Sequence, residues 1–386
     1  MATISCLSIA SAIADGPVPL APFISGSANL YPKMPERIGK SAWELWYFDG
    51  VTSDGQAAVA VAFFRDALGA TKGGFRVQVH VLWRDGTPLS TEFYCQKSTV
   101  MEYQDGRVVG TWQDSGPSGL REASFDIAPD LSTASLSFQD PTVVSGSITL
   151  TRIHDHTLLP TDEKEVEFGI DVYYIRPFAI SAAVVDLELR SDSGEPRQFT
   201  LRQEDKAIGG MDRFWTHLSW PQIMSESYHL RAGAGPYRLH VLRILSTSST
   251  GKVPYGSARL YKDNQVICAP QTAINHGEQK CEADYMIVTK LYCDAKEAVR
   301  GKFRDANVGY RIEFVQQDAG KILGHWRFDA VNCHPWWNLP TSAPGPDGTG
   351  NSGFMVKVSG GMLAGEGDSG NEMCEGFGGA GQAELP

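Results

Sequence analysis

The sequence predicts an all-β protein of two domains, and three observations support this interpretation. Apolar and polar residues alternate with period two from residue 43 onward, and tight-turn dipeptides separate several of the alternating runs. Only residues 294–302 have a helix-like pattern, and a chain of 386 residues is longer than one hydrophobic core usually serves. The residues alone therefore favour two β-sandwich or β-barrel domains over a parallel sheet built from βαβ units.

The clearest alternation lies in residues 75–83, where every odd position is apolar. Asp-Gly pairs at 49/50, 85/86 and 105/106 predict tight or bulged turns, because those positions need a positive φ that Gly and Asp tolerate. These features predict short meander connections between consecutive strands. Further strands are expected at residues 147–153, 166–174, 237–243, 310–315 and 353–358.

The domain boundary is expected near residue 220, within about 15 residues, which gives a first domain of residues 1–220 and a second of residues 221–386. Other candidate breaks lie at residues 190–196 and 233–236. From about residue 365 the chain is Gly-rich, acidic and poor in apolar groups, which predicts a loose tail. The GxGxxG pattern at residues 376–381 lacks a strand-turn-helix context and predicts no nucleotide site.

Composition argues against several classes of partner. A net charge of -11 without a dense Lys/Arg run argues against binding to nucleic acid or anionic membranes. No apolar run approaches the roughly 18 residues that a membrane-spanning helix needs, so membrane insertion is not expected. Seven cysteines without a CxxC pair, and no Asn-x-Ser/Thr site, predict reduced thiols in a cytoplasmic protein.

Motifs for cofactors and metals are missing from the sequence. It contains no GxxxxGK[ST], HExxH or GxSxG pattern, so no nucleotide cofactor, zincin site or nucleophile elbow is expected. His154 and His156 could form a metal pair, but no third ligand at a useful spacing can be named. We therefore expect no cofactor and no metal.

Three aromatic clusters indicate a binding site for an apolar small molecule. Residues 41–50 contain four aromatics and two carboxylates, and alternation puts Glu44 on the same strand face as Trp46. Residues 211–221 and 333–340 are similarly rich in aromatics. Large aromatics beside a few polar groups are typical of such pockets. The alternative interpretation is a core strand whose acid caps a neighbouring turn.

Lys357 is a second candidate, because it opposes the apolar face of residues 354–358. A solvated lysine on an outer surface is one interpretation. The other is a polar position that faces a ligand in a barrel, where a lysine can donate up to three hydrogen bonds to an anionic or carbonyl-bearing ligand.

Several segments resemble the fungal Diels-Alderases that form decalin rings on tetramate-bearing polyketides. They are residues 43–49 (WELWYFD), 210–215 (GMDRFW), 219–222 (SWPQ), 226–228 (ESY), 325–328 (HWRF) and 354–358 (FMVKV). The likeness runs over most of the chain, and that family is distantly similar to carotenoid hydratases with two lipocalin-like domains. The resemblance implies an N-terminal β-sandwich-like domain and a C-terminal lipocalin-like β-barrel, with the substrate pocket between them.

The resemblance also implies a function. It points to a cofactor-independent pericyclase that converts a linear polyenoyl tetramate, the product of a polyketide synthase and peptide synthetase, to a decalin by an intramolecular Diels-Alder cycloaddition. A polyene hydratase or isomerase of the same fold is an alternative, although it needs a general acid, and residues 213–217 lack the His/Asp-rich stretch of the hydratases. A non-catalytic lipocalin-like carrier of a hydrophobic metabolite is another.

Residue by residue, the resemblance implies that Lys357 anchors the acyl-tetramate oxygens, with Trp337 and Asn338 near the same end. Gln78 and His80 stand where some relatives have Glu and Asn, and Trp215 and Trp220 are expected to form aromatic walls. The catalytic candidates are Lys357, Glu44 and Tyr174, and the substrate-binding candidates are Trp46, Gln78, His80, Trp215, Trp220, Tyr228, Trp337 and Asn338.

Overall fold

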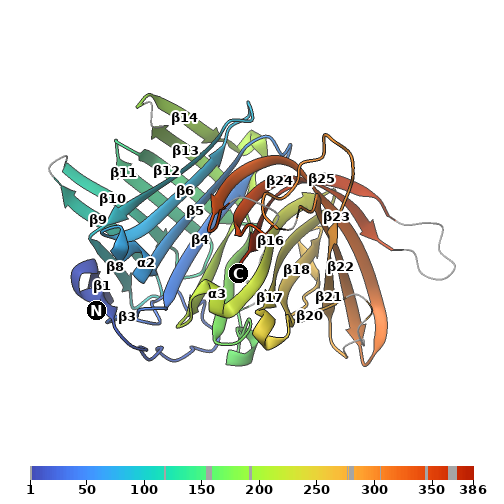
Figure 1. Ribbon diagram of the computed structural model, residues 1–386, viewed down its shortest axis with the longest axis horizontal. Coiled ribbons are helices and arrows are strands. Elements are labelled where there is room, and N and C mark those ends of the chain that lie inside the picture. The colour runs from blue at the N-terminus through green and yellow to red at the C-terminus, as the bar shows by residue number, and fades with distance from the viewer. Residues whose placement is uncertain are drawn as a thin grey trace. The chain divides into compact units, whose positions relative to one another are not determined.

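The structure is a computed structural model that describes residues 2–116, 119–153, 159–190, 194–275, 277, 282–304, 306–343, 347–363 and 372–386. The chain forms two compact units, both made mostly of β-strands (Figure 1). The first comprises Met1–Gly50, Val59–Val81 and Leu89–Ser219, and the second comprises Val51–Ala58, Leu82–Pro88 and Trp220–Pro386. The main division thus falls between Ser219 and Trp220, while two short segments from the first half of the sequence belong to the second unit.

The first sheet has thirteen strands in the order β1-β8-β9-β10-β11-β12-β13-β15-β4-β5-β6-β7, with β14 paired to β13. Its strands are β1 (Thr3–Ser8), β4 (Trp43–Val51), β5 (Ala58–Asp66), β6 (Phe75–Leu82), β7 (Pro88–Cys95), β8 (Lys97–Glu102), β9 (Val108–Gly116), β10 (Gly119–Ile127), β11 (Thr133–Asp140), β12 (Val144–Arg152), β13 (Val172–Arg190), β14 (Pro196–Leu201) and β15 (Ile208–Thr216). The short strands β2 (Ile13–Ala14) and β3 (Ile38–Gly39) pair in parallel, and the short helices are α1 (Ile9–Ala12) and α2 (Ala67–Thr71).

Aromatic packing makes the first unit a β-sandwich, as expected. Trp46 on β4 contacts Trp112 on β9 at a ring-centroid distance of 5.6 Å, and Phe125 on β10 at 5.8 Å. The Trp112 Nε1 group donates a hydrogen bond of 2.9 Å to the carbonyl of Phe64 on β5. Because strands far apart in the sheet order meet through these rings, the sheet folds over to enclose one aromatic core.

The second sheet has ten strands in the order β19-β18-β17-β16-β25-β24-β23-β22-β21-β20 and curls into the lipocalin-like barrel (Figure 1). Its strands are β16 (Met224–Ala234), β17 (Tyr237–Ser246), β18 (Pro254–Lys262), β19 (Gln265–Cys268), β20 (Ala273–Ile274), β21 (Tyr285–Leu291), β22 (Gly309–Asp318), β23 (Lys321–Pro340), β24 (Gly350–Met362) and β25 (Cys374–Glu384), and α3 (Trp220–Ile223) precedes them. The described parts of the chain also include 3₁₀ turns at Glu163–Glu165, Gln203–Asp205 and Ser248–Thr250.

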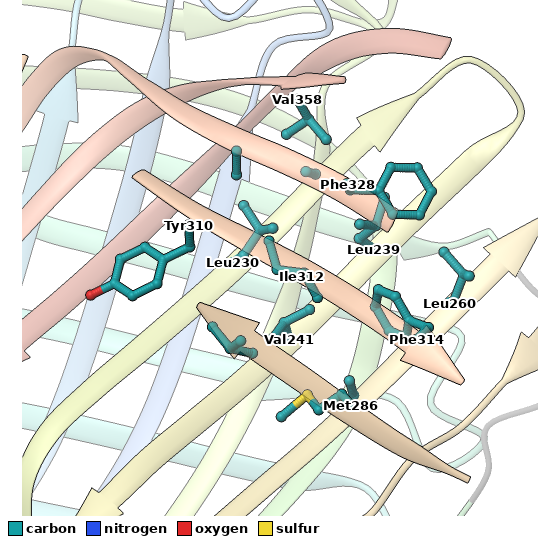
Figure 2. Packing of buried hydrophobic residues seen from close by; sticks show 14 of the residues in the cluster. Leu230, Leu239, Val241, Leu260, Met286, Tyr310, Ile312, Phe314, Phe328 and Val358 are labelled. Carbon is teal, nitrogen blue, oxygen red and sulfur yellow. The ribbon is translucent and has the colours of Figure 1, made fainter. Parts of the chain in front are cut away.

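The inner face of this curled sheet carries an apolar core. Figure 2 shows side chains from β16, β17, β18, β21, β22, β23 and β24 pointing toward one another. Core positions alternate with outward positions along each strand, as on β24, where Phe354, Val356 and Val358 point inward. The period-two pattern of the sequence therefore marks the wall of the barrel.

Three local predictions were wrong. Residues 166–171 form a tight turn before β13, in which the Phe168 N–H bonds the Val172 carbonyl at 2.7 Å and Asp171 has a φ of 56°. Residues 294–302 form an irregular loop with a turn in place of a helix, and Arg300 Nη2 donates to the carbonyls of Cys293 and Ala295 in this loop. The Asp-Gly pair at 49/50 lies inside β4, and the turn follows it at residues 52–57.

The predicted loose tail was also wrong, because β25 lies in the middle of the second sheet between β16 and β24. Its glycines permit close packing: a Cβ added at Gly378 would lie 2.4 Å from the Cβ of Ala232. The Gly-rich composition thus reflects contact between neighbouring chain segments rather than a lack of structure.

His154 and His156 lie outside the described residues. Among the helices that the structure does describe, none has the length and apolar character that a membrane crossing requires.

Candidate functional site

Lys357 projects from the outer face of β24, opposite to the core positions on either side of it. The interpretation that placed it inside the barrel was therefore wrong, because the interior positions of β24 are its apolar ones. Its side chain is 46% exposed, and its Nζ atom lies 2.9 Å from Oε1 of Glu375 on β25. Its cross-strand neighbours are Val331 on β23 and Phe377 on β25. An ion pair this exposed contributes only about 0–1 kcal/mol to stability. Glu375 therefore orients the ammonium group, which can still exchange this partner for another anion.

A turn of the second unit packs against the strand beside Lys357. Gly55 has a φ of 68°, and a Cβ added there would lie 2.4 Å from the ring of Phe377. Asp54 in the same turn forms an ion pair of 2.7 Å with Arg84 from the other short segment of this unit. The surface next to Lys357 is therefore built by segments that are about 300 residues apart in sequence.

Two indoles lie on a floor of glycines farther along the same face. A Cβ added at Gly353 would lie 2.2 Å from the Trp337 ring, and one added at Gly379 would lie 3.0 Å from the Trp336 ring. Trp337 donates through Nε1 to Oδ1 of Asn351. Gly353 and Lys357 are four residues apart on β24, about 13 Å at the usual rise per residue, so Trp337 shares the face of Lys357 but does not contact it.

Asn338 lies on the other face of the strand pair. It is paired in register with Ser352, whose hydroxyl donates to Asn338 Oδ1 at 3.2 Å. The structure therefore separates Asn338 from Lys357 and Trp337, with which the family resemblance grouped it.

Glu44 is fully buried and its carboxylate is engaged on both oxygens. It forms an ion pair with Arg213 on β15, and both side chains are 0% exposed. Oε1 accepts from the backbone N–H of Met34 at 2.8 Å and Oε2 from that of Lys33 at 3.0 Å. Burial lowers the pKa of Arg213, while the neighbouring carboxylate opposes that shift. Glu44 thus anchors the segment before β4 as well as the guanidinium group.

Trp46 and Trp215 surround the same guanidinium. Arg213 Cζ lies 4.0 Å from the Trp46 ring centroid and 5.4 Å from that of Trp215. Trp46 Nε1 donates to the Leu30 carbonyl at 3.0 Å, and Trp215 stacks on Tyr173 with 5.5 Å between centroids. Glu44, Trp46 and Trp215 therefore form one buried cluster around Arg213.

Tyr174 belongs to a different group of side chains. Its hydroxyl donates to Asp212 Oδ1 at 2.6 Å, and its ring packs on Phe214 at 4.6 Å. Phe214 in turn contacts Trp43 at 6.2 Å. Because Trp43 alternates with Glu44 on β4, this group lies on the opposite face of the sheet from the Arg213 cluster.

Gln78 and His80 lie on β6 and bond to the neighbouring strand β7. Gln78 Nε2 donates to Glu92 Oε2 at 3.2 Å, and His80 Nδ1 lies 2.9 Å from the Ser90 hydroxyl. Burial lowers the pKa of His80 to about 4, although Glu92 acts in the opposite direction. At neutral pH, His80 is therefore an uncharged imidazole.

Ring contacts assign Gln78 and His80 to the face of Tyr174. Phe63 on β5 contacts Phe48, which is on the core face. Phe64 points the other way, and Arg76 Cζ lies 3.9 Å from its ring centroid. The even positions of β6 therefore share the face of Trp43. The predicted residues of the first unit divide into Tyr174, Gln78 and His80 on this face, and Glu44, Trp46 and Trp215 on the core face.

Tyr228 and Trp220 lie in the second unit. Tyr228 is a barrel-interior residue that stacks on Tyr310 with 3.8 Å between ring centroids, and burial raises the pKa of its hydroxyl. Trp220 begins α3 and is half-buried. Tyr228 therefore does not lie on the outer face that carries Lys357.

Sequence reasoning missed three residues that the structure brings to these groups. Arg213 lies in residues 210–215, which were considered only for their family resemblance. Glu44 on the adjacent strand could have pointed to Arg213, because a buried carboxylate needs a cation beside it. Glu375 and Phe377 were missed because their segment was interpreted as a tail. Glycine has no side chain to show alternation, so residues 374–381 carry no local signal for a strand.

Each unit thus presents one face that combines aromatic surface with hydrogen-bonding groups. The second unit offers the ammonium group of Lys357 beside Phe377, and the first offers Gln78 and His80 with Tyr174. Groups of this kind can orient a flexible apolar ligand and polarise a carbonyl.

Comparison with known proteins gives a consistent picture. A family model described as Diels-Alderase-like matches residues 1–386. A Diels-Alderase of Gibberella fujikuroi is 38% identical over 361 residues, which are 93% of this chain and 94% of the relative. Diels-Alderase fsa2 of Fusarium heterosporum is 38% identical over 388 residues, 99% of each chain. The crystal structure of CghA with Sch210972 matches with a TM-score of 0.90 at 36% identity, covering 99% of this chain and 98% of that one.

Proposed function

This chain belongs to the Diels-Alderase-like family, and on that premise we propose that it catalyses a stereoselective intramolecular Diels-Alder cycloaddition. The proposed substrate is a linear polyenoyl tetramate or a similar polyketide, and the product is a decalin. A small-molecule substrate agrees with CghA, which has been crystallised with Sch210972. The enzyme would thus act on the released product of a polyketide synthase and peptide synthetase.

The cycloaddition requires orientation more than chemical activation. It forms two carbon–carbon bonds in a concerted step and transfers neither a proton nor a redox equivalent, so it needs no acid–base pair. Holding the diene and dienophile together can lower the barrier by up to about 7–11 kcal/mol in favourable systems. One charge-assisted hydrogen bond to the carbonyl conjugated with the dienophile adds about 1.5–3 kcal/mol. Aromatic surface for the chain and one strong donor for the head group are therefore sufficient.

The observation that carries the proposal is the setting of Lys357. Its ammonium group is half-exposed, is oriented by a weak ion pair with Glu375, and lies beside the ring of Phe377 on the face that also bears Trp337. We propose that it exchanges Glu375 for the acyl-tetramate oxygens, which carry negative charge as an enolate, while the aromatic surface supports the polyene.

The other candidates are proposed for different roles. Tyr174, Gln78 and His80 are proposed to contact the substrate, because their hydrogen-bonding groups share one face of the first sheet. Tyr174 and His80 are buried there, so this contact requires the substrate to enter beside them. Glu44, Trp46 and Trp215 are proposed to support the site from the core, because the carboxylate of Glu44 is already engaged. Trp220, Tyr228 and Asn338 stay as substrate-binding proposals.

One incubation tests the proposal. A linear polyenoyl tetramate is followed with and without the purified protein, and decalin stereoisomers are separated by chiral chromatography. The proposal predicts faster formation of one stereoisomer, a rate that is flat with pH, and no loss after dialysis against EDTA. An unchanged rate and isomer ratio, with linear substrate and product bound equally, would indicate a carrier, since uniform binding does not accelerate a reaction. A hydrated product would indicate a hydratase.

We also propose a cytoplasmic location, next to the synthase that supplies the substrate. In support, the thiols of Cys95 and Cys268 are buried in the two units without a disulfide. Such unpaired thiols are usual in a reducing compartment.

A further inference from the structure

The interior of the curled sheet changes character along its length. In Figure 2, Tyr310 lies at one end of the labelled cluster, and Phe314 on the same strand lies toward the other. Past Tyr310, the inward-facing positions of β16, β17, β21 and β25 carry polar side chains in place of apolar ones. These side chains, which we call the polar end of the barrel, are Glu226, Arg243, Lys290, Gln382 and Glu384.

Four charged groups here balance one another. Glu226 and Glu384 are directly opposite in the β16–β25 ladder, and like charges in that relation destabilise a sheet. Lys290 Nζ lies 2.8 Å from Glu226 and 2.9 Å from Glu384, and Arg304 Nε lies 3.0 Å from Glu384. Two carboxylates and two cations thus form a neutral network.

Arg243 remains as an additional positive charge. Its side chain is 9% exposed, and the acid contact that the structure records for it is 3.8 Å to Glu226, which is already bound by Lys290. A guanidinium group has five N–H donors, and burying such a charge without close acceptors is costly. Within the described part of the chain, its environment therefore favours an anion.

Tyr228 adds a neutral donor at the same place. It is directly opposite Arg243 in the β16–β17 ladder, so their Cβ atoms are about 5 Å apart on the same face. Among the described residues, no hydrogen-bond partner is found for the buried Tyr228 hydroxyl. Tyr310 stacks on Tyr228, and burial raises the pKa of both hydroxyls, which keeps them protonated at neutral pH.

We propose that the polar end of the barrel binds a small carboxylate, which accepts paired hydrogen bonds from Arg243 and one from Tyr228. A carboxylate fits better than a spherical anion, because its two oxygens match the fork of a guanidinium group. The site faces the barrel interior, whereas Lys357 lies on the outer face of the same sheet. Tyr228 is also proposed to bind the substrate of the cycloaddition, whereas Arg243 has no part in that proposal.

Acetate is the probe for this site. Saturation transfer to the acetate methyl protons is measured by NMR on the full-length protein, with sodium chloride holding ionic strength constant, and acetate is titrated to obtain a dissociation constant. Arg243→Gln is expected to weaken acetate binding about tenfold or more, and Tyr228→Phe severalfold, because one charge-assisted and one neutral donor are lost. Arg327→Gln, on the outer face, is the matched control and should bind acetate as the wild type does.

The outcomes are distinct. Binding that falls in the order wild type, Tyr228→Phe, Arg243→Gln supports the site, and Tyr228→Phe alone carries the test if Arg243→Gln does not fold. No transfer in the wild type, equal transfer in all variants, or displacement of acetate by equimolar chloride would overturn the proposal. The decalin assay is read separately, so failure of one proposal does not imply failure of the other.

Discussion

Replacing Glu44 by glutamine tests whether this carboxylate holds the fold together. The change keeps the shape of the side chain but removes the charge that Arg213 faces, and both groups are 0% exposed. Leaving one member of a buried ion pair without its partner typically costs about 3–5 kcal/mol. The NH2 group of the new amide also faces one of the Lys33 and Met34 backbone donors, which bond the carboxylate at 3.0 and 2.8 Å. We therefore expect the free energy of unfolding to fall by about 3 kcal/mol or more.

Urea unfolding followed by tryptophan fluorescence measures this loss. Glu188→Gln is the matched control, because Glu188 forms a partly exposed pair with Arg190 at 3.4 Å, for which a cost of about 0–1 kcal/mol is expected. A loss in Glu44→Gln no larger than that in Glu188→Gln would refute the interpretation of Glu44 as a structural anchor. It would then favour a direct role in the chemistry.

Two further predictions concern Trp337 and His80. Gly353→Ala places a Cβ 2.2 Å from the Cε3 atom of Trp337, so the free energy of unfolding in urea should fall by about 1–3 kcal/mol and tryptophan emission should change. Gly233→Ala is the control and should change neither quantity. Equal behaviour of the two variants would contradict the packing of Trp337 on Gly353. His80 stays neutral in the folded protein down to about pH 4 while the unfolded imidazole titrates near 6.5, so lowering the pH from 6.5 to 4 should remove up to about 3 kcal/mol of stability. His80→Asn should lack this part of the pH dependence, and parallel stability curves for both proteins would count against a buried His80.

The strands were the predictable part of the fold, because a period-two pattern reports which side of a sheet faces a core. The same pattern misled at residues 166–171, where Val166 and Phe168 are buried by a turn rather than a strand. It also failed in β25, where glycine has no side chain to show alternation. Packing against Ala232 and Trp336 explains those glycines, and such long-range contacts are invisible in a local window.

The sequence predicted which types of residue form the candidate site better than it predicted which of them lie together. Alternation correctly placed Trp43 and Glu44 on opposite faces, but it could not show that Arg213, which is 169 residues away, takes the Glu44 carboxylate. For Lys357 the pattern showed a side chain opposite the apolar face but left open whether it faced solvent or a ligand in the barrel. Its partner Glu375 came from a segment without a strand signal. Pairing between distant strands supplies this information, and a single sequence does not contain it.

The most direct test of the proposed mechanism is the rate and stereochemistry of decalin formation by Lys357→Met. Methionine keeps much of the length of the side chain and removes the charge, so losing one charge-assisted bond of about 1.5–3 kcal/mol should slow cyclisation about tenfold to a hundredfold. The isomer ratio should shift toward that of the uncatalysed reaction, while Lys321→Met, at an exposed lysine of the same sheet, keeps both. Wild-type rate and isomer ratio in Lys357→Met, with an unchanged melting temperature, would contradict the proposal that Lys357 anchors the substrate.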